Sequence, residues 1–369
     1  MALAIGPWLG GWLTEHTSWR WVFFVNLPVA LAALPTVAFF FPHIVHHDSE
    51  DKSIDWLGAA LMAVAIGCLL MAAEYAQSHG FWSSTALALW LGTGLASTVF
   101  FRHQYRTRAP IVPPVVLDNT AARQLMALGV LTGLTMFMLI FYTPLLLQGS
   151  FGQSPHEAGI VMTPLLVCIT LGSILNGRLL PRLKRAERLI AWGQLGTLLA
   201  CVAMAQLQPD TPRALLMLAF GLCGASFGFQ LPNLTMQLMA VAGRSHLGVA
   251  GALAQTTRMV GNMVGVGLAS VLVNSLYTRT VQQTLDKLQL HDNALAQLLA
   301  TPQVLVRQED QQALQQLSRS LGTDPAALLQ AAKQGLLSGT HAAFWMCAAV
   351  SAVAMLISLR LPHYDLRRR

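Results

Sequence analysis

The hydrophobic positions of this chain fall into long runs separated by short polar connections. Ten runs approach the ~20 residues that a helix needs to cross a bilayer: 2–14, 20–41, 55–76, 84–101, 123–147, 157–180, 188–207, 213–237, 247–276 and 340–361. The first run is shorter than the others, and we interpret it as an incomplete span. Because backbone in lipid must satisfy its own hydrogen bonds, the pattern predicts an all-α integral membrane protein with about ten transmembrane helices.

The connection 277–339 differs from the others because it is long, polar and rich in Gln, Leu and Ala. It is predicted to form two or three amphipathic helices, divided near Thr301-Pro302 and near Pro325. Leucines near helical spacing would give them apolar faces: Leu285, Leu288, Leu290, Leu314, Leu317, Leu328, Leu329, Leu336 and Leu337. The segment could cover the outer mouth or dock a partner. The pattern favours a solvated insertion instead.

Basic residues gather in alternate connections, and this alternation predicts an orientation. One set of connections holds Lys52, Arg102, Arg106, Arg108, Arg123, Arg178, Arg182, Lys184, Arg185, Arg188, Arg244, Arg360 and Arg367 to Arg369. The opposite short connections hold only Arg20 and Arg213. Since Lys and Arg accumulate in cytoplasmic loops, we expect the basic set and the C-terminus on the cytoplasmic side of an inner membrane. Residues 277–339 are then expected outside.

Composition agrees with a membrane protein and argues against several other classes. Hydrophobic residues make up 54% of the chain and charged residues 11%, and the mean hydropathy is +0.53. The net charge of +7 is confined to loops beside apolar helices and does not indicate nucleic-acid binding. The five cysteines lie in apolar runs without paired spacing, so we interpret them as core residues: Cys68, Cys168, Cys201, Cys223 and Cys347.

An enzyme would need a reactive cluster near a membrane face, and one stretch offers candidates. His43, His46, His47 and Asp48 lie close together in a predicted cytoplasmic loop. No second cluster completes a site of the kind that metal chemistry requires. We therefore expect no enzyme activity, no metal site and no cofactor.

The opening stretch carries the most distinctive motif. Pro7 has no backbone N–H to donate and bends a helix. Gly6, Gly10 and Gly11 leave one face of the helix without side chains, so that a neighbouring helix can approach closely. The run from Ile5 to Pro28 resembles the antiporter signature in the fifth helix of the major facilitator superfamily. It is similar to the drug:proton antiporter branch with fourteen helices, the EmrB/QacA type. A Gly-Pro kink in an unrelated helical membrane protein is the alternative.

The resemblance implies a major facilitator fold whose first four helices are missing from this chain. Residues 1–41 would supply the last two helices of the N-terminal half, incompletely, and 42–122 a two-helix insert with a cytoplasmic link. Residues 123–369 would form the C-terminal six-helix half with the outside loop 277–339. The implied function is proton-coupled multidrug efflux by alternating access, with this chain an inactive fragment.

The same resemblance implies no cofactor beyond the proton gradient. The expected partners are the lipid bilayer, small amphipathic or cationic drugs and a periplasmic adaptor protein, and no nucleic acid. The alternative function is a structural or channel-like membrane subunit without coupled transport.

A basic loop also resembles a family motif. The run containing Gly177, Arg178, Arg182 and Arg185 is similar to a degenerate second copy of the family's cytoplasmic Gly-Arg loop motif. Such arginines can latch one conformation by binding a helix C-terminus or lipid phosphates. Ordinary enrichment of basic residues on the cytoplasmic side explains most of them equally well.

Arg258 is the most notable polar residue within a predicted helix. It lies about ten residues into its helix, where an arginine costs about 2.5–3.5 kcal/mol on insertion scales. Gly261, Gly265 and Gly267 just beyond it predict a tight helix contact across which Arg258 points. Asn262, in the same stretch, is a further candidate for the pathway together with Gly261 and Gly265. Arg258 either lines or gates the transport pathway, or turns inward to backbone carbonyls.

Further candidates for a substrate cavity lie on two helices. Met136, Phe137 and Tyr142 would offer a soft aromatic surface to bulky cations, although core or lipid-facing packing is the commoner role. Gln230, Asn233 and Gln237 flank Pro232 and suit either a cavity or interhelical hydrogen bonds. Glu74 lies near its helix end, where an interfacial role is expected.

Overall fold

The computed structural model describes residues 17–18, 20–40, 54–79, 83–183, 185, 187–290, 292–321 and 323–362. The chain forms two compact units, Met1–Ile54 and Asp55–Arg369. In the first unit, α2 (Trp21–Phe24) leads into the apolar helix α3 (Asn26–Phe40). The predicted run 2–14, including Gly6, Pro7, Gly10 and Gly11, lies outside the described residues, as do His43, His46, His47 and Asp48.

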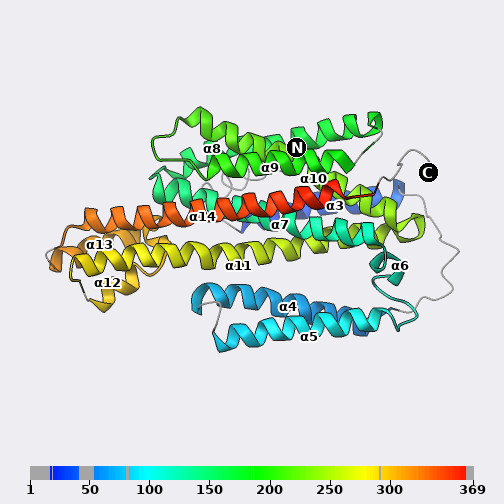
Figure 1. Ribbon diagram of the computed structural model, residues 1–369, viewed down its shortest axis with the longest axis horizontal. Coiled ribbons are helices and arrows are strands. Elements are labelled where there is room, and N and C mark those ends of the chain that lie inside the picture. Colours follow the sequence, from blue (N-terminus) through cyan, green and yellow to red (C-terminus); the bar gives the residue numbers. More distant parts are fainter. Residues whose placement is uncertain are drawn as a thin grey trace. The chain divides into compact units, whose positions relative to one another are not determined.

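The second unit is a bundle of long helices with a helical hairpin beside it (Figure 1). Its elements are α4 (Trp56–His79), α5 (Ser84–Gln104), α6 (Pro114–Leu117), α7 (Thr120–Leu145), α8 (Pro155–Leu179), α9 (Glu187–Met204), α10 (Arg213–Ala242), α11 (Leu247–Lys287), α12 (Asn293–Leu298), α13 (Gln308–Ser320) and α14 (Pro325–Leu359). Within the described residues, seven helices are long and apolar enough to cross a membrane. The prediction of an all-α membrane protein is therefore confirmed.

Local sequence explains where several of these helices begin. Asn119 and Asp324 accept hydrogen bonds from the first backbone amides of α7 and α14. Ser154 and Glu157 form a reciprocal capping box at the start of α8. These side chains satisfy amides that have no partner inside the helix, which makes each starting point well defined.

Two helix pairs in the bundle approach to backbone contact, and glycines make this possible. On α7 and α11, a Cβ at Gly265 would lie 2.5 Å from the carbonyl oxygen of Leu134, and one at Gly261 would overlap the carbonyl of Val130. On α8 and α10, a Cβ at Gly228 would lie 2.5 Å from the carbonyl oxygen of Ile169. In lipid, such close packing replaces the hydrophobic effect as the force that joins helices.

The two close pairs are related by the order of the helices. If α7, α8 and α9 are matched in order with α10, α11 and α14, then the pair α7–α11 corresponds to the pair α10–α8. This correspondence agrees with two three-helix repeats, an arrangement common among secondary transporters, although the packing of α11 on α14 has no comparable counterpart between α8 and α9.

The segment 277–339, called the extension below, differs from the prediction at both ends. The apolar run 247–276 was expected to end the span, but α11 continues to Lys287, and α14 begins at Pro325 rather than near 340. The physical reason is the apolar spacing of Tyr277, Val281 and Leu285, which keeps one face of α11 buried beyond the membrane-length run.

The predicted amphipathic helices of the extension are confirmed as α12, α13 and the first turns of α14. Leu314, Leu328 and Leu336 are buried in a core continuous with that of the bundle, whereas Leu288 is 41% exposed. The Tyr277 hydroxyl donates to the carbonyl oxygen of Thr301 at 3.3 Å. The extension is thus packed onto the end of α11 and α14, where Figure 1 shows α12 and α13.

The hairpin α4–α5 is fastened at one end by a buried carboxylate. Asp55 accepts hydrogen bonds from the Gly58 amide (2.8 Å), His103 Nε2 (2.8 Å) and Gln104 Nε2 (2.9 Å). Burial raises the pKa of Asp55, but these hydrogen bonds outweigh it and leave the pKa below its usual value. Gln104 in turn accepts from the Val112 amide, so one carboxylate connects both hairpin helices to the following loop.

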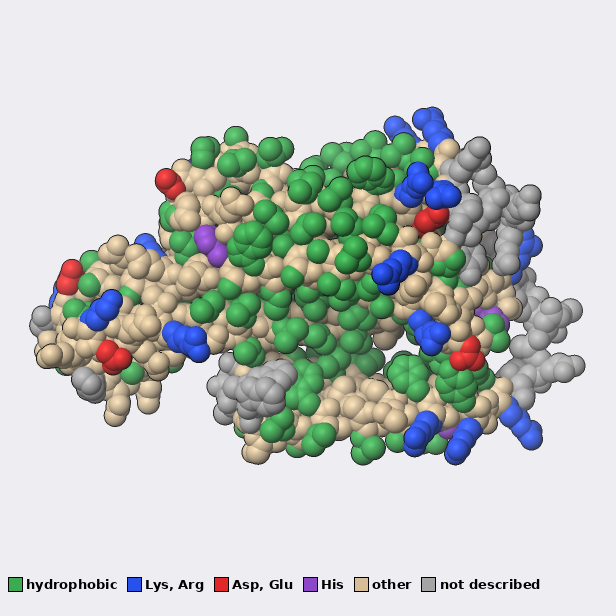
Figure 2. Space-filling model, in the orientation of Figure 1, with side chains coloured by type: hydrophobic (Ala, Val, Ile, Leu, Met, Phe, Trp, Pro, Cys, Tyr) green, Lys and Arg blue, Asp and Glu red, His purple; other side chains and the backbone are tan. Residues whose placement is uncertain are grey.

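Arginines gather at this same end of the helices, which is called the basic end below. It carries Arg102, Arg106, Arg108, Arg123, Arg178, Arg182, Arg185, Arg188, Arg244 and Arg360. Figure 2 shows basic side chains clustered there, on the side of α6 and away from the extension. The separation of charge predicted from the sequence is therefore present along the bundle.

Candidate functional site

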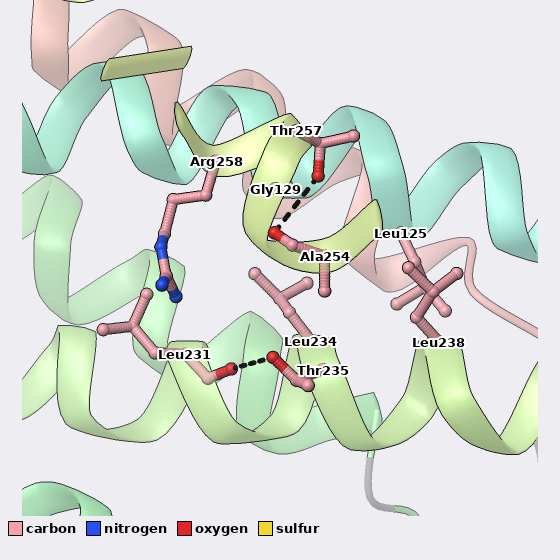
Figure 3. Close-up of a pocket in the computed structure, with 9 residues that line it drawn as sticks. All are labelled: Leu125, Gly129, Leu231, Leu234, Thr235, Leu238, Ala254, Thr257 and Arg258. Carbon is pink, nitrogen blue, oxygen red and sulfur yellow. Dashed lines mark hydrogen bonds between the residues drawn. The ribbon is translucent and has the colours of Figure 1, made fainter. Parts of the chain in front are cut away.

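Arg258 lies in a crevice between three helices. The crevice has a volume of about 10 Å³, close to the space of one water molecule, and is lined by Leu125, Gly129, Leu231, Leu234, Thr235, Leu238, Ala254, Thr257 and Arg258. In Figure 3 the guanidinium points from α11 toward Leu231 on α10. Arg258 is the twelfth residue of α11, about 17 Å along the helix, so its depth agrees with the prediction.

The half-buried guanidinium has an amide and no carboxylate as its neighbour. Arg258 donates to the side chain of Gln255 one turn earlier on α11, and neither ion pair in the described part of the chain includes Arg258. A cation at this depth without an acidic partner is costly, because little water compensates for its desolvation. Whether Arg258 lines or gates a transport pathway stays a prediction.

The backbone beside Arg258 forms the close crossing of α7 and α11. The side-chain amide of Asn262 lies 3.1 Å from the carbonyl oxygen of Arg258 and 2.9 Å from that of Gly133, with its nitrogen as donor. A Cβ at Gly129 would lie 2.7 Å from the Thr257 hydroxyl. Gly261 and Gly265, expected at a tight contact, and Asn262 are thus brought together with Gly129 and Gly133 of α7.

A chain of hydrogen bonds runs through the interior of the bundle. Gln194 Nε2 donates to Thr132 Oγ1 (3.0 Å), which donates to Gln230 Oε1 (3.1 Å). Gln230 Nε2 donates to Thr197 Oγ1 (2.7 Å), which donates to the carbonyl oxygen of Gly193 (3.1 Å). These four side chains come from α7, α9 and α10 and are all buried. The network therefore joins three helices through polar groups that have no access to solvent.

Replacing Gln230 with leucine is expected to destabilise the bundle by about 1–3 kcal/mol, because Thr132 would keep a buried hydroxyl without its acceptor. Thr163→Val serves as the control, since Thr163 is exposed and donates only to Gly159 of its own helix. Unfolding of the purified chain in detergent measures both variants. Equal stability of the two would show that the network is dispensable.

The other predicted amides lie nearby and are also buried. Asn233 Nδ2 donates to Asn176 Oδ1 at 2.5 Å, which joins α10 to α8, and also to the carbonyl oxygen of Phe229 at 2.8 Å. Gln237 is 6% exposed and its side-chain nitrogen has no partner in the described structure. Gln230, Asn233 and Gln237 do not line the Arg258 crevice or either of the two larger cavities described below. A role for these residues in substrate binding stays a prediction.

A larger cavity lies where the bundle meets the extension, and we call it the extension cavity. Its volume is about 630 Å³, within the range of drug-sized sites. It is lined by Glu74, Phe141, Tyr142, Pro144, Leu145, Gln148, Ser270, Asn274, Thr301, Pro302, Gln303, Val306 and Arg307. The cavity thus combines two adjacent aromatic rings, several amides and hydroxyls, and one group of each charge.

A local irregularity of α7 shapes this cavity. Pro144 interrupts the helix, and residues Leu146–Ser150 continue as a wider π-helical turn. Such turns reposition side chains and are frequent at functional sites. The rings of Phe141 and Tyr142 meet edge to face with centroids 5.4 Å apart. Of the predicted aromatic surface, Tyr142 lines the cavity, Met136 packs on the core and Phe137 is 40% exposed.

The residues of the basic loop motif lie together at the end of α8. Gly177, Arg178, Arg182 and Arg185 are all exposed, and a Cβ at Gly177 would meet nothing within 4 Å. Neither ion pair of the described residues includes these arginines. Whether they latch one conformation stays a prediction.

Several structurally important polar residues were not anticipated from the sequence. Thr132, Gln194 and Thr197 belong to the buried network, and Asp55 holds the hairpin. The first three could have been found as polar residues inside apolar helices. Asp55 precedes an apolar run by one residue, which is the position of a helix-capping side chain.

The fold defines a class of protein, a polytopic helical membrane protein. The family model of the Major Facilitator Superfamily matches residues 1–266, so the chain belongs to that family, a family of transporters and not of enzymes. The family match confirms that part of the predicted resemblance.

Three curated relatives have related sequences. A multidrug transporter protein, MdtP, of Bacillus subtilis (strain 168) is 25% identical, covering 98% of this chain and 68% of the relative. A methylenomycin A resistance protein from the same strain is 27% identical, with coverage of 74% and 58%. A tetracenomycin C resistance and export protein of Streptomyces glaucescens is 28% identical, with coverage of 74% and 50%. This chain therefore spans about half to two thirds of the length of these relatives.

Proposed function

We propose that this chain acts in proton-coupled multidrug efflux by alternating access. The observation that carries the proposal is the extension cavity, where a carboxylate and two aromatic rings line a space of drug size. The relatives named for multidrug transport, antibiotic resistance and export support the direction of transport. The two three-helix repeats of the bundle support a rocking mechanism around a site between helices.

The chemistry of the extension cavity favours small amphipathic or cationic drugs as substrates. Glu74 supplies a negative charge, and the rings of Phe141 and Tyr142 supply apolar area and faces that attract cations. Within the described residues no ion pair occupies Glu74. A carboxylate without a basic partner, next to two aromatic rings, would attract the positive charge of a drug.

Binding of a fluorescent cationic dye to the purified chain tests this role of the cavity. Glu74→Gln is expected to weaken binding of the cation about tenfold while leaving a neutral analogue unchanged. Glu309→Gln is the control, because Glu309 is exposed on α13 and does not line the cavity. The proposal would be contradicted if Glu309→Gln weakened binding of the cation as much as Glu74→Gln does. It would also be contradicted if Glu74→Gln weakened binding of the neutral analogue as much as binding of the cation.

In the proposed orientation the protein lies in an inner membrane, with the basic end and the C-terminus in the cytoplasm and the extension outside. Cysteines introduced by Ser320→Cys and Ser245→Cys occupy exposed positions in the extension and at the basic end. A membrane-impermeant maleimide added to intact cells is expected to label only the first. Ser318 is unsuitable for this measurement because it is fully buried. Labelling of Ser245→Cys alone would reverse the topology.

The finer assignment to the fourteen-helix drug:proton antiporter branch is also a proposal, supported by the run from Ile5 to Pro28. A periplasmic adaptor protein remains a proposed partner. Passive flux of substrates without proton movement would favour the alternative, a channel-like subunit.

A further inference from the structure

A second large cavity separates the α4–α5 hairpin from the bundle, and we call it the hairpin cavity. Its volume is about 550 Å³. Side chains from α4, α5, α7 and α11 line it, and Figure 2 shows the surface hollowed between the hairpin and the bundle. It shares no residue with the extension cavity, so it is a separate site.

The walls of the hairpin cavity are almost entirely apolar along its length. Met62 and Ile66 of α4, Phe100 of α5, and Met126 and Val130 of α7 represent this lining. From Arg123 to Val130 the cavity follows seven residues of α7, about 10 Å, from the basic end toward the middle of the membrane. An unfilled apolar space of this size would forfeit dispersion contacts, so a hydrocarbon chain is its natural occupant.

The mouth of the hairpin cavity carries the opposite chemistry. Arg123 is exposed there and contacts only the Thr120 hydroxyl, at 3.4 Å, among the hydrogen bonds of the described residues. The Tyr105 hydroxyl donates a hydrogen bond to the Asp118 carboxylate at 2.8 Å, so this carboxylate already has a donor. Asp55 is likewise engaged by His103 and Gln104.

Both carboxylates near this mouth in the described part of the chain, Asp55 and Asp118, therefore have donors of their own. The described residues at this end of α5 and α7 include four arginines, Arg102, Arg106, Arg108 and Arg123. A guanidinium suits phosphate oxygens in particular, and basic pockets between membrane helices bind anionic head groups.

We propose that the hairpin cavity binds an anionic phospholipid, with an acyl chain between the hairpin and the bundle and the phosphate at Arg123. A cationic drug would be repelled by Arg123 and gains no carboxylate in the lining. The lipid fills the space between α5 and α7 and so couples the hairpin to the bundle. The site shares no lining residue with the extension cavity, where the drug is proposed to bind.

Lipid retention by the purified full chain, measured by native mass spectrometry, tests the proposal. The chain is expected to retain about one phosphatidylglycerol and to prefer it over phosphatidylcholine. Arg123→Gln should lower phosphatidylglycerol retention about fivefold, the effect of one basic residue near a lipid surface. Arg244→Gln is the matched control because Arg244 is exposed at the basic end outside the cavity.

A second variant distinguishes the cavity from the surface charge. Ala127→Phe fills the lining of α7 and should abolish retention of the acyl chain, while inorganic phosphate should not compete with the lipid. Equal loss in Arg123→Gln and Arg244→Gln would reduce the effect to general surface charge and overturn the site. Equal retention of the two phospholipids would also overturn it. Arg123→Gln decides the question even if Ala127→Phe does not fold, because Arg123 lies on the surface.

Discussion

Replacing Gly261 with valine is expected to prevent the bundle from closing. A Cβ at this position would overlap the backbone carbonyl of Val130 on α7. Neither the Cβ nor the carbonyl can move without moving its own helix. The helices must then separate, and the contacts at Gly265 with Leu134 and at Asn262 with Gly133 separate with them. Overpacking alone costs about 1–3 kcal/mol, and the loss of the whole crossing adds to this cost.

The control for this variant lies on the same helix. Gly248→Ala introduces a Cβ on α11 that meets nothing within 4 Å, and the gain in helix propensity should leave the chain as stable or slightly more stable. Thermal unfolding and the yield of monodisperse protein in detergent measure both. A Gly261→Val variant with the yield and stability of Gly248→Ala would show that α7 and α11 do not cross as described.

Replacing Arg258 with leucine is expected to lower transport without lowering the stability of the bundle. The guanidinium is half-buried in a crevice with room for about one water molecule, and its hydrogen-bond partner is the neutral Gln255. Removing a poorly compensated charge should leave the bundle equally stable or more stable, by up to about 3 kcal/mol. Drug efflux should nevertheless fall more than tenfold if Arg258 lines or gates the transport pathway, which is the role predicted for it from the sequence.

Arg258→Lys and Arg244→Gln complete the test of this residue. Lysine keeps the charge and should retain part of the efflux, whereas Arg244 lies exposed at the basic end and its replacement should change little. A large loss of stability in Arg258→Leu would mean that the guanidinium is a structural anchor to backbone carbonyls. That result would contradict a role in the pathway.

The hydrophobic pattern predicts the helices of the bundle well, because length and apolar composition are local properties. It fails at the extension, where the polarity of residues after 276 suggested that the helix had ended. α11 continues because Tyr277, Val281 and Leu285 bury one face against α14, and such a partner is invisible in a single run of sequence. The start of α14 at Pro325, earlier than the predicted start near 340, is marked by Asp324, a local capping signal that the sequence does contain.

The sites were predictable only in part, for a similar reason. Polar residues within apolar helices can be identified from the sequence, and Arg258, Gln230 and Asn233 were found in this way. Their neighbours depend on how helices distant in sequence pack. Thr132 meets Gln230 across 98 positions of the chain, and the extension cavity joins Glu74 of the hairpin to residues of α7, α11 and the extension. No local pattern indicates which residues meet in this way.

Proton exchange during drug transport tests the central claim most directly. The chain is expressed with any sequence its gene encodes before residue 1, and everted membrane vesicles are acidified inside by respiration. Adding a cationic drug should dissipate part of the pH gradient in these vesicles, and not in vesicles carrying the Glu74→Gln variant. Collapse of the gradient with nigericin should stop drug uptake. Drug uptake that continues unchanged after the pH gradient collapses would contradict proton-coupled efflux.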